Sequence, residues 1–261
     1  MIPEERKAYF NSAAAEREQW KSRNWYYHEA VGRLLMFLVP PGKSVLEIGC
    51  GTGETLALVK PKRGLGVDIS AQMVGMACVK YPQYEWRVDN AESLGVTEHF
   101  DYVIVSDLLG YLDDIEGAFQ NLQHVSHEQT KIIITYYNYL WERALRLGER
   151  LHLKRRQPLQ NWMSPRDIEN MLNLAGFEVI KEGRRMVCPI YIPLVSTFFN
   201  RFVGNMPIVN LLGIIQYVVA RPIPKKDICS YSVSIVIPCR NEKGNVENAV
   251  KRIPSFGAST E

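Results

Sequence analysis

The sequence has little that would hold it in a membrane. Its longest stretch without a charged side chain, residues 202–220, is interrupted by asparagine, glutamine, proline and glycine. A spanning helix needs about 20 predominantly apolar residues. Polar and helix-breaking residues in this stretch favour a soluble helix followed by a strand instead. We therefore expect no transmembrane helix.

Cysteine is also scarce. The five cysteines, Cys50, Cys78, Cys188, Cys229 and Cys239, are odd in number and form no pair at metal-ligand spacing. The N-terminal residues Met1–Arg6 are polar and lack the apolar core of a secretory signal. We expect a cytoplasmic protein without a metal site.

Neither sign of charge is in strong excess. Lys and Arg together number 31 and Asp and Glu together 28, so bulk charge gives no indication of a nucleic-acid partner. Basic side chains do gather in residues 143–156. Such a run usually forms a solvated helix face. Because it precedes the apolar segment Ile190–Leu212, the alternative is peripheral contact with anionic lipid or with a phosphate-bearing acceptor.

The chain does contain an alternation of short apolar runs and helical stretches. Strands are expected at Ser44–Ile48, Gly64–Val67, Tyr84–Val88, Tyr102–Val105 and Lys131–Tyr136, and helices between them at Glu54–Lys60, Ala71–Lys80 and Ile115–Val125. Residues 1–40 are expected to form a helical N-terminal cover. Parallel βαβ units with right-handed crossovers place helices on both faces of one sheet. The predicted fold class is therefore α/β.

Further elements are expected to complete this sheet. Ser164 and Pro165 mark the start of a helix. After it we expect a sixth strand at Glu178–Cys188, an apolar helical segment at Ile192–Leu212 and a seventh strand at Ile214–Ala220.

The strongest motif is Val45–Gly53, in which an apolar strand runs into glycines at three alternate positions, Gly49, Gly51 and Gly53. Glycine lets the loop turn sharply and lets a ligand touch the backbone. The dinucleotide fingerprint places its last glycine one residue further along, which disfavours an NAD-dependent enzyme. Glu47 precedes the glycines and would repel a pyrophosphate, whereas it could hold an ammonium group.

Two polar segments follow the next strands. Asp68 is expected at the tip of the second strand, where a carboxylate can accept hydrogen bonds from both hydroxyls of a ribose. Asp89–Leu94 follows the third strand and forms a polar turn suited to an adenine edge. In this turn Asn90 or Asp89 could accept from the exocyclic amine, and the Ala91 N–H could donate to the ring.

Together these motifs resemble the class I S-adenosylmethionine (SAM) dependent methyltransferases, in particular their quinone- and small-molecule-methylating branch. The matching segments are Glu47–Gly53, Val67–Ser70, Asp89–Leu94 and Phe100–Asp107, and the resemblance covers about Met1–Arg221. It implies a Rossmann-like seven-stranded sheet whose last strand is antiparallel. It also implies SAM as cofactor, held by Glu47, Gly49, Cys50, Gly51, Gly53, Asp68, Ile69, Asp89, Asn90, Ala91 and Ser106.

Asp107, after the fourth strand, is the candidate catalytic residue, because ligands of such sheets bind at the carboxyl ends of the strands. As a base it would serve a poorly ionised acceptor. A helix cap or turn acid is the equally weighted alternative. Phe10, Tyr26 and Tyr27 are candidates for a lid over the sulfonium, or else for helix packing onto the sheet.

The expected domains are a methyltransferase domain at 1–223, a linker at 224–231 and a new domain at 232–261. Residues 232–246 resemble the opening strand and loop of glycosyltransferases of the polyprenyl-phosphate-mannose-synthase kind. The resemblance implies that Pro238 and Glu242 line a nucleotide pocket, and that a fusion has been truncated here. We therefore expect methyl transfer to a small-molecule or lipid-linked acceptor. The alternative is a non-catalytic SAM-binding module of such a fusion.

Overall fold

The computed structural model describes residues 3–155, 157 and 160–224, and beyond these 232–233, 235–236, 246, 250–252 and 259–260. The chain divides into two units, Met1–Ile223 and Pro224–Glu261. In the second unit a short strand β8 (Ser232–Val233) pairs in parallel with β9 (Ser259–Thr260). Of the opening strand and loop expected at 232–246, Pro238 and Glu242 lie outside the described residues.

The first unit is built on one seven-stranded sheet with the order β3-β2-β1-β4-β5-β7-β6. Its strands are β1 (Ser44–Ile48), β2 (Arg63–Asp68), β3 (Glu85–Val88), β4 (Phe100–Ser106), β5 (Ser126–Tyr137), β6 (Phe177–Arg185) and β7 (Ile215–Pro222). β7 lies between β5 and β6 and is antiparallel to both. The expected mostly parallel sheet with an antiparallel last strand is thus confirmed.

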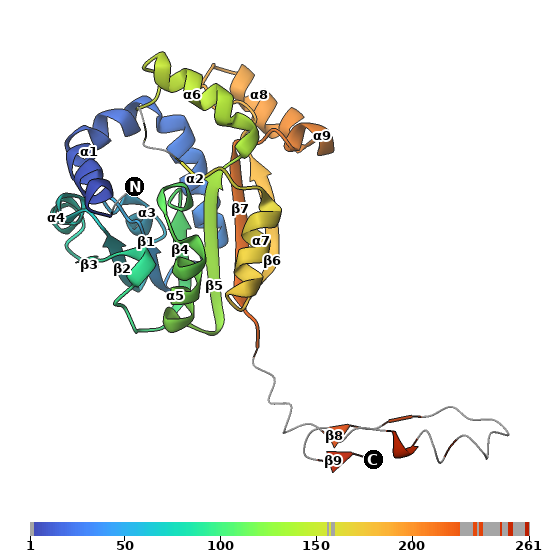
Figure 1. Cartoon of the computed structure of the whole chain (residues 1–261). Helices are drawn as coiled ribbons and strands as arrows, with labels where there is room; N and C mark the ends of the chain where they lie inside the picture. Colours follow the sequence, from blue (N-terminus) through green and yellow to red (C-terminus); the bar gives the residue numbers. More distant parts are fainter. Residues whose placement is uncertain are drawn as a thin grey trace. The chain divides into compact units, whose positions relative to one another are not determined.

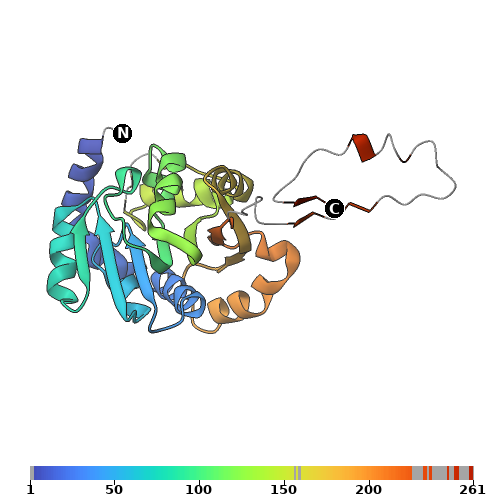
Figure 2. The ribbon, with the colours of Figure 1, turned by 90° about the horizontal axis from the view of Figure 1, so that it is seen from below.

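Helices pack on both faces of this sheet (Figures 1 and 2). The described helices of this unit are α1 (Pro3–Arg23), α2 (Trp25–Leu38), α3 (Glu54–Leu58), α4 (Ala71–Lys80), α5 (Ile115–Asn121), α6 (Glu142–Arg150), α7 (Pro165–Leu174), α8 (Val195–Arg201) and α9 (Pro207–Asn210); α6, α8 and α9 lie beyond one end of the sheet. Short 3-10 turns lie at Ala91–Ser93, Leu109–Tyr111, Leu122–Val125, Tyr139–Trp141 and Val203–Asn205.

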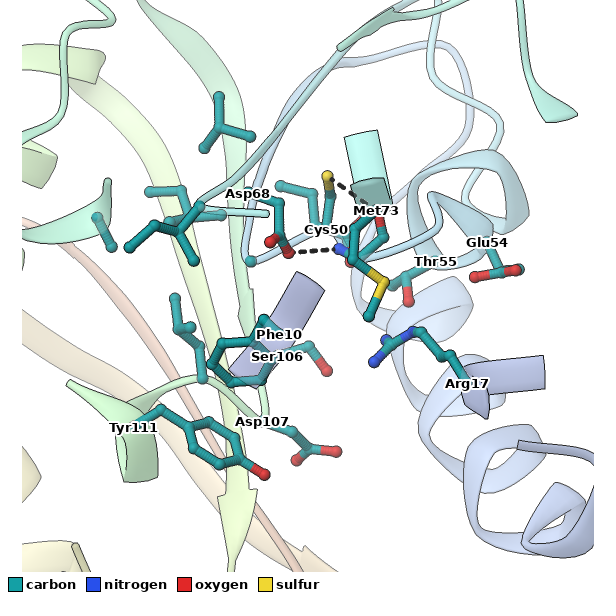
Figure 3. A pocket seen from close by; sticks show the side chains of 18 of the residues that line it. Phe10, Arg17, Cys50, Glu54, Thr55, Asp68, Met73, Ser106, Asp107 and Tyr111 are labelled. Carbon is teal, nitrogen blue, oxygen red and sulfur yellow. Dashed lines mark hydrogen bonds between the residues drawn. The ribbon is translucent and has the colours of Figure 1, made fainter. Parts of the chain in front are cut away.

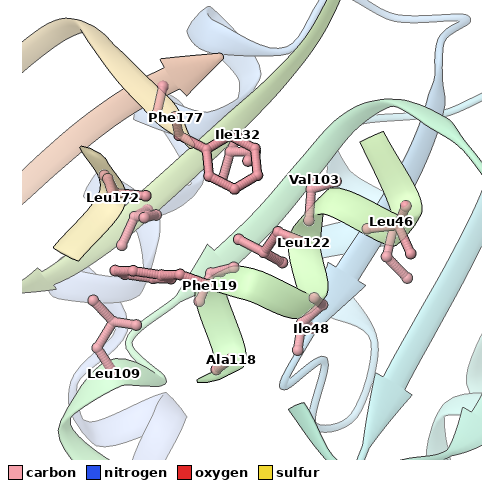
Figure 4. Packing of buried hydrophobic residues seen from close by; sticks show 14 of the residues in the cluster. Leu46, Ile48, Val103, Leu109, Ala118, Phe119, Leu122, Ile132, Leu172 and Phe177 are labelled. Carbon is pink, nitrogen blue, oxygen red and sulfur yellow. The ribbon is translucent and has the colours of Figure 1, made fainter. Parts of the chain in front are cut away.

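Two hydrophobic clusters fill the spaces between the sheet and its helices. Along β4, Val103 and Val105 belong to one cluster and Tyr102 and Ile104 to the other, because successive side chains of a strand point to opposite faces. The first cluster contains side chains of α5 and α7, such as Phe119, and appears in Figure 4. The second contains side chains of α2 and α3. Burial on both faces explains why the central strands are almost wholly apolar.

The N-terminal segment forms two helices, α1 and α2. α1 packs on α4 through Ala13, Ala14 and Met73. Its Arg6 side chain is buried, pairs with Glu92 and donates to the carbonyl oxygen of Tyr111 at 2.8 Å. The start of α1 is therefore tied to the loops at the carboxyl ends of the sheet.

The segment expected as one apolar helix, Ile192–Leu212, is instead divided into α8, a 3-10 turn and α9. Pro207 lacks the N–H that a continuous helix needs. The Asn210 side chain donates to the carbonyl of Gly204 at 2.9 Å and replaces a helical partner there. The sixth strand ends at Arg185 rather than Cys188, because Met186 has a left-handed φ of 64°.

Among the described residues, no helix is both long and apolar enough to cross a bilayer. Nor do three His, Cys, Asp or Glu side chains of this part of the chain come together in an arrangement that could hold a metal ion.

Candidate active site

The glycine loop after β1 has a left-handed backbone at each of its glycines, with φ of 77° at Gly49, 54° at Gly51 and 84° at Gly53. A Cβ at Gly51 would lie 2.6 Å from the guanidinium of Arg17, and one at Gly49 would lie 3.0 Å from Leu108. Both positions therefore need glycine for conformation and for space.

Gly53 has a different neighbour, since a Cβ there would lie 2.5 Å from the Trp86 ring. It does not belong to the wall of the adjoining cavity. Gly53 thus packs against β3, and the structure does not bring it to the predicted cofactor wall.

Asp68, at the end of β2, fastens the glycine loop (Figure 3). One carboxylate oxygen accepts from the Gly51 N–H at 2.8 Å, and the other accepts from the Ser70 N–H at 2.9 Å. Burial raises the pKa of this carboxyl, whereas the two N–H donors oppose that rise. Ser70 in turn caps α4 by accepting from the Met73 N–H. Asp68 is therefore held in a fixed position at the cavity wall.

A cavity of about 530 Å³ lies against these loops, between α1 and the carboxyl ends of the strands. Apart from Gly53, all predicted cofactor residues line it, and Asp107 does as well: Glu47, Gly49, Cys50, Gly51, Asp68, Ile69, Asp89, Asn90, Ala91, Ser106 and Asp107. Residues from four strand ends thus meet at one site, although 60 positions separate Glu47 from Asp107.

In the polar turn after β3, side-chain oxygens support the backbone. Asp89 accepts from the N–H groups of Asn90 and Gly95 at 2.8 and 2.9 Å. Asn90 accepts from the Glu92 N–H at 3.1 Å. Both side chains therefore shape the turn, and the choice between them as the adenine contact stays a prediction.

Glu47 lies beneath the glycine loop and is 2% exposed. Its carboxyl group accepts from the Leu56 N–H in α3 at 2.9 Å. Burial raises its pKa to about 8, and neighbouring Lys21 only partly opposes this. At neutral pH Glu47 is thus largely protonated.

Glu47→Gln is expected to stabilise the domain at alkaline pH. The folded chain holds the Glu47 proton up to about pH 8, whereas the unfolded chain releases it near 4.5, so the stability of the native domain falls as pH rises between these values. Glutamine keeps the acceptor for Leu56 and has no charge to desolvate. We expect the variant to gain about 2–4 kcal/mol at pH 8 and progressively less toward pH 4.5. Urea unfolding across this range measures it; parallel stability profiles for the two proteins would contradict the assignment.

Asp107 occupies a strained turn, with a φ of 53°. The Tyr27 hydroxyl lies 3.0 and 2.9 Å from its two carboxylate oxygens, and Thr135 donates to it at 3.5 Å. Burial raises the pKa of Asp107. Burial and the adjacent Asp107 also raise the pKa of Tyr27 well above its ordinary value, so Tyr27 stays protonated and donates to the carboxylate.

A second cavity, of about 690 Å³, shares wall residues with the first, among them Phe10, Arg17 and Tyr137. Nine aromatic side chains line it: Tyr9, Phe10, Trp20, Trp25, Tyr27, Tyr111, Tyr137, Trp141 and Tyr191. Its basic residues are Arg17, Lys21, Arg23, Lys154 and Arg155, and no acidic side chain belongs to the described part of its wall. Three of these basic residues pair with acids nearby: Lys21 with Glu54, Lys154 with Glu149 and Arg155 with Glu16.

Arg17 and His28 are among the wall residues that were not predicted. Arg17 projects from α1 into the first cavity (Figure 3), and among the described residues its buried Nε has no hydrogen-bond partner. The pKa of His28 falls to about 3 because of burial and nearby Lys21 and Arg17, so His28 is neutral. Neither residue belongs to a sequence motif. The sequence shows only that both lie in the N-terminal segment that is expected to be helical. Tyr26, a lid candidate, instead accepts from Asn200 at 2.9 Å.

A family model described as a methyltransferase domain matches residues 22–182. The chain belongs to this methyltransferase family. Its fold is similar to a SAM-dependent methyltransferase of Thermotoga maritima, with a TM-score of 0.63 and 16% identity, covering 83% of this chain and 99% of the other. It is also similar to the Synechocystis magnesium protoporphyrin IX methyltransferase with bound SAH, with a TM-score of 0.58 and 18% identity, covering 83% and 97%.

Among curated proteins, the chain is similar to protein 235L of Invertebrate iridescent virus 6, which is named as a methyltransferase. The two sequences are 22% identical over 118 residues. The match spans 44% of this chain and 44% of that relative.

The cofactor of this SAM-dependent methyltransferase family is SAM, and the residues of the first cavity fit it. The anchored Asp68 carboxylate suits a ribose diol. The buried Nε–H of Arg17, which has no partner in the described part of the chain, suits the carboxylate of the amino-acid end. The side-chain-free backbone at Gly49 and Gly51 allows close approach of a ligand.

Proposed function

We propose that this domain transfers the methyl group of SAM to a small-molecule or lipid-linked acceptor bound in the second cavity. One observation carries the proposal: the Asp107–Tyr27 hydrogen bond joins a wall residue of the first cavity to a wall residue of the second. An acceptor atom near this pair would lie between both ligand spaces. Tyr27 is buried and Asp107 has a strained backbone, and both features are frequent at functional sites.

Bound SAM supplies an electrophilic methyl group on a sulfonium. The protein's main contribution is then to place the acceptor and to exclude water. The aromatic wall of the second cavity orients an apolar acceptor. Asp107 accepts the proton that the attacking group releases, and its raised pKa brings it closer to the range of an effective general base. Tyr27 and Thr135 hold the carboxylate in position.

The acceptor is proposed to be an apolar molecule with an anionic group, such as a lipid-linked phosphate. Support comes from the excess of basic over acidic side chains in the second cavity. We further propose that the protein is cytoplasmic. That residues 232–261 begin a glycosyltransferase domain is a proposal supported by the motif there alone.

The test uses the purified chain with methyl-labelled SAM and two acceptor pools, a polyprenyl and quinone lipid extract and a water-soluble metabolite extract. We expect labelled product in the lipid pool, identified by mass spectrometry. Asp107→Asn serves as the control for enzymatic transfer. Tight SAM binding without a methylated product in either pool would favour the non-catalytic binding module instead.

A further inference from the structure

The segment between β6 and β7 exposes an unusual number of large apolar side chains. Leu194 is 86% exposed, Ile208 81%, Ile190 66% and Phe202 60%. We call this the α8–α9 surface; its exposed members are Ile190, Tyr191, Ile192, Leu194, Val195, Phe198, Phe199, Phe202, Met206, Ile208, Leu211 and Leu212. Scattered exposed apolar residues are ordinary, but twelve large apolar side chains exposed within residues 190–212 indicate an interaction surface.

The charge of this segment is one-sided. From Met186 to Ala220 the sequence contains one charged residue, Arg201, and no acid. A protein partner would ordinarily be met by a surface with a mixed polar rim. A surface of exposed aromatic and aliphatic side chains with basic charge alone is complementary to an anionic lipid interface.

α6 adjoins the α8–α9 surface and adds exposed apolar side chains and basic side chains to it. The Trp141 indole at its start donates to the carbonyl of Leu212 at 2.6 Å, and Asn138 donates to the carbonyl of Leu211 at 2.8 Å. Figure 1 shows α6, α8 and α9 beyond the same end of the sheet. Around α6, Leu140, Leu147 and Leu151 are exposed, and the helix carries three arginines, Arg143, Arg146 and Arg150, against two acids, Glu142 and Glu149. Of these arginines, Arg146 pairs with Glu142.

The surface is also continuous with the second cavity. Ile190 and Tyr191 are exposed and at the same time line that cavity, beside Trp25 and Trp141. Tyr191 packs against Trp25 with ring centroids 5.1 Å apart. A molecule that leaves a bilayer at this surface would thus meet the cavity wall directly.

We propose that the α8–α9 surface, with α6 as its basic border, docks on an anionic lipid bilayer, from which the acceptor passes into the second cavity. The last step rests on the proposed function, whereas bilayer docking does not. The apolar side chains enter the interfacial layer and the arginines contact the lipid phosphates. The second cavity then opens toward the bilayer that supplies the acceptor.

The test is co-sedimentation with vesicles of phosphatidylcholine mixed with phosphatidylglycerol, and with vesicles of phosphatidylcholine alone. We expect the chain to bind the anionic vesicles and F198E/F202E to lower the bound fraction about tenfold. Val79→Glu and Leu174→Glu are matched controls, since these residues are 83% and 73% exposed on α4 and α7. Both controls should bind like the parent chain. High salt should weaken binding only in part, because the apolar contacts remain.

The outcomes separate this proposal from the proposed function. SAH binding and melting temperature of F198E/F202E should equal those of the parent, which establishes that the variant folds. Equal vesicle binding by parent and F198E/F202E would overturn the proposal. The proposal would also be overturned if the parent chain bound no vesicles and analytical ultracentrifugation showed a dimer of the parent and a monomer of F198E/F202E. Vesicle binding without methyl transfer would contradict the proposed function and leave docking intact.

Discussion

Replacing Asp107 by asparagine is expected to lower kcat by about 100- to 1000-fold while the affinity for SAM changes less than about threefold. Asparagine matches the shape of aspartate and tolerates the left-handed backbone that this position adopts, with φ of 53°. It can still accept a hydrogen bond from Tyr27, but it cannot take a proton from the acceptor. The loss should therefore appear in kcat rather than in cofactor binding.

Steady-state kinetics with the acceptor from the labelled extract, and calorimetry with SAH, measure the two quantities. Tyr27→Phe is the companion variant, because it removes the donor at 2.9 Å and leaves the carboxylate. We expect it to cost about tenfold in kcat, consistent with a positioning role. If Asp107→Asn keeps kcat within about threefold of the parent, Asp107 is a turn residue and not the base.

Asp68→Asn is expected to weaken SAH binding about 100-fold, or about 2.7 kcal/mol. The two carboxylate oxygens accept from Gly51 and Ser70, so an amide must turn its NH₂ group toward one of these N–H donors. The glycine loop or the start of α4 then loses its anchor. The ribose diol also loses an ionised acceptor, and charge-assisted hydrogen bonds are the stronger kind.

Asp101→Asn is the matched control for this experiment. Asp101 also accepts from a backbone N–H, that of Ser44 at 2.9 Å, but it lies at the amino-terminal ends of β1 and β4. Calorimetric titration with SAH should give the parent Kd for this variant. A folded Asp68→Asn protein that binds SAH within about threefold of the parent would contradict the assigned role of Asp68.

The sequence was sufficient for those parts of the site that are local. Glycines after a buried strand, followed by an acid at the end of the next strand, are typical of a nucleotide-like cofactor site. Parallel strands bring these ends to one edge of the sheet. The strands could also be predicted locally, because short apolar runs between turn residues are typical of buried strands. Gly53 shows the limit of the pattern, because its spacing matched the cofactor loop while its neighbour in space is Trp86.

What the sequence left hidden depends on tertiary packing. Arg17 reaches Gly51 only because α1 docks on α4, and no motif marks that helix. The break between α8 and α9 depends on side-chain hydrogen bonds of Asn210 that hydrophobic periodicity does not report. The second cavity joins residues from α1, α2 and α6 and has no sequence signature at all.

The shared wall of the two cavities has a thermodynamic consequence. α1 contributes Phe10 and Arg17 to both, so each ligand would bias the position of the same helix. When one element serves two sites, the first ligand bears the entropic cost of ordering it, and the second ligand then binds without that cost. Linkage then requires reciprocity: if bound SAM strengthens the affinity for the acceptor, the acceptor strengthens the affinity for SAM by the same factor.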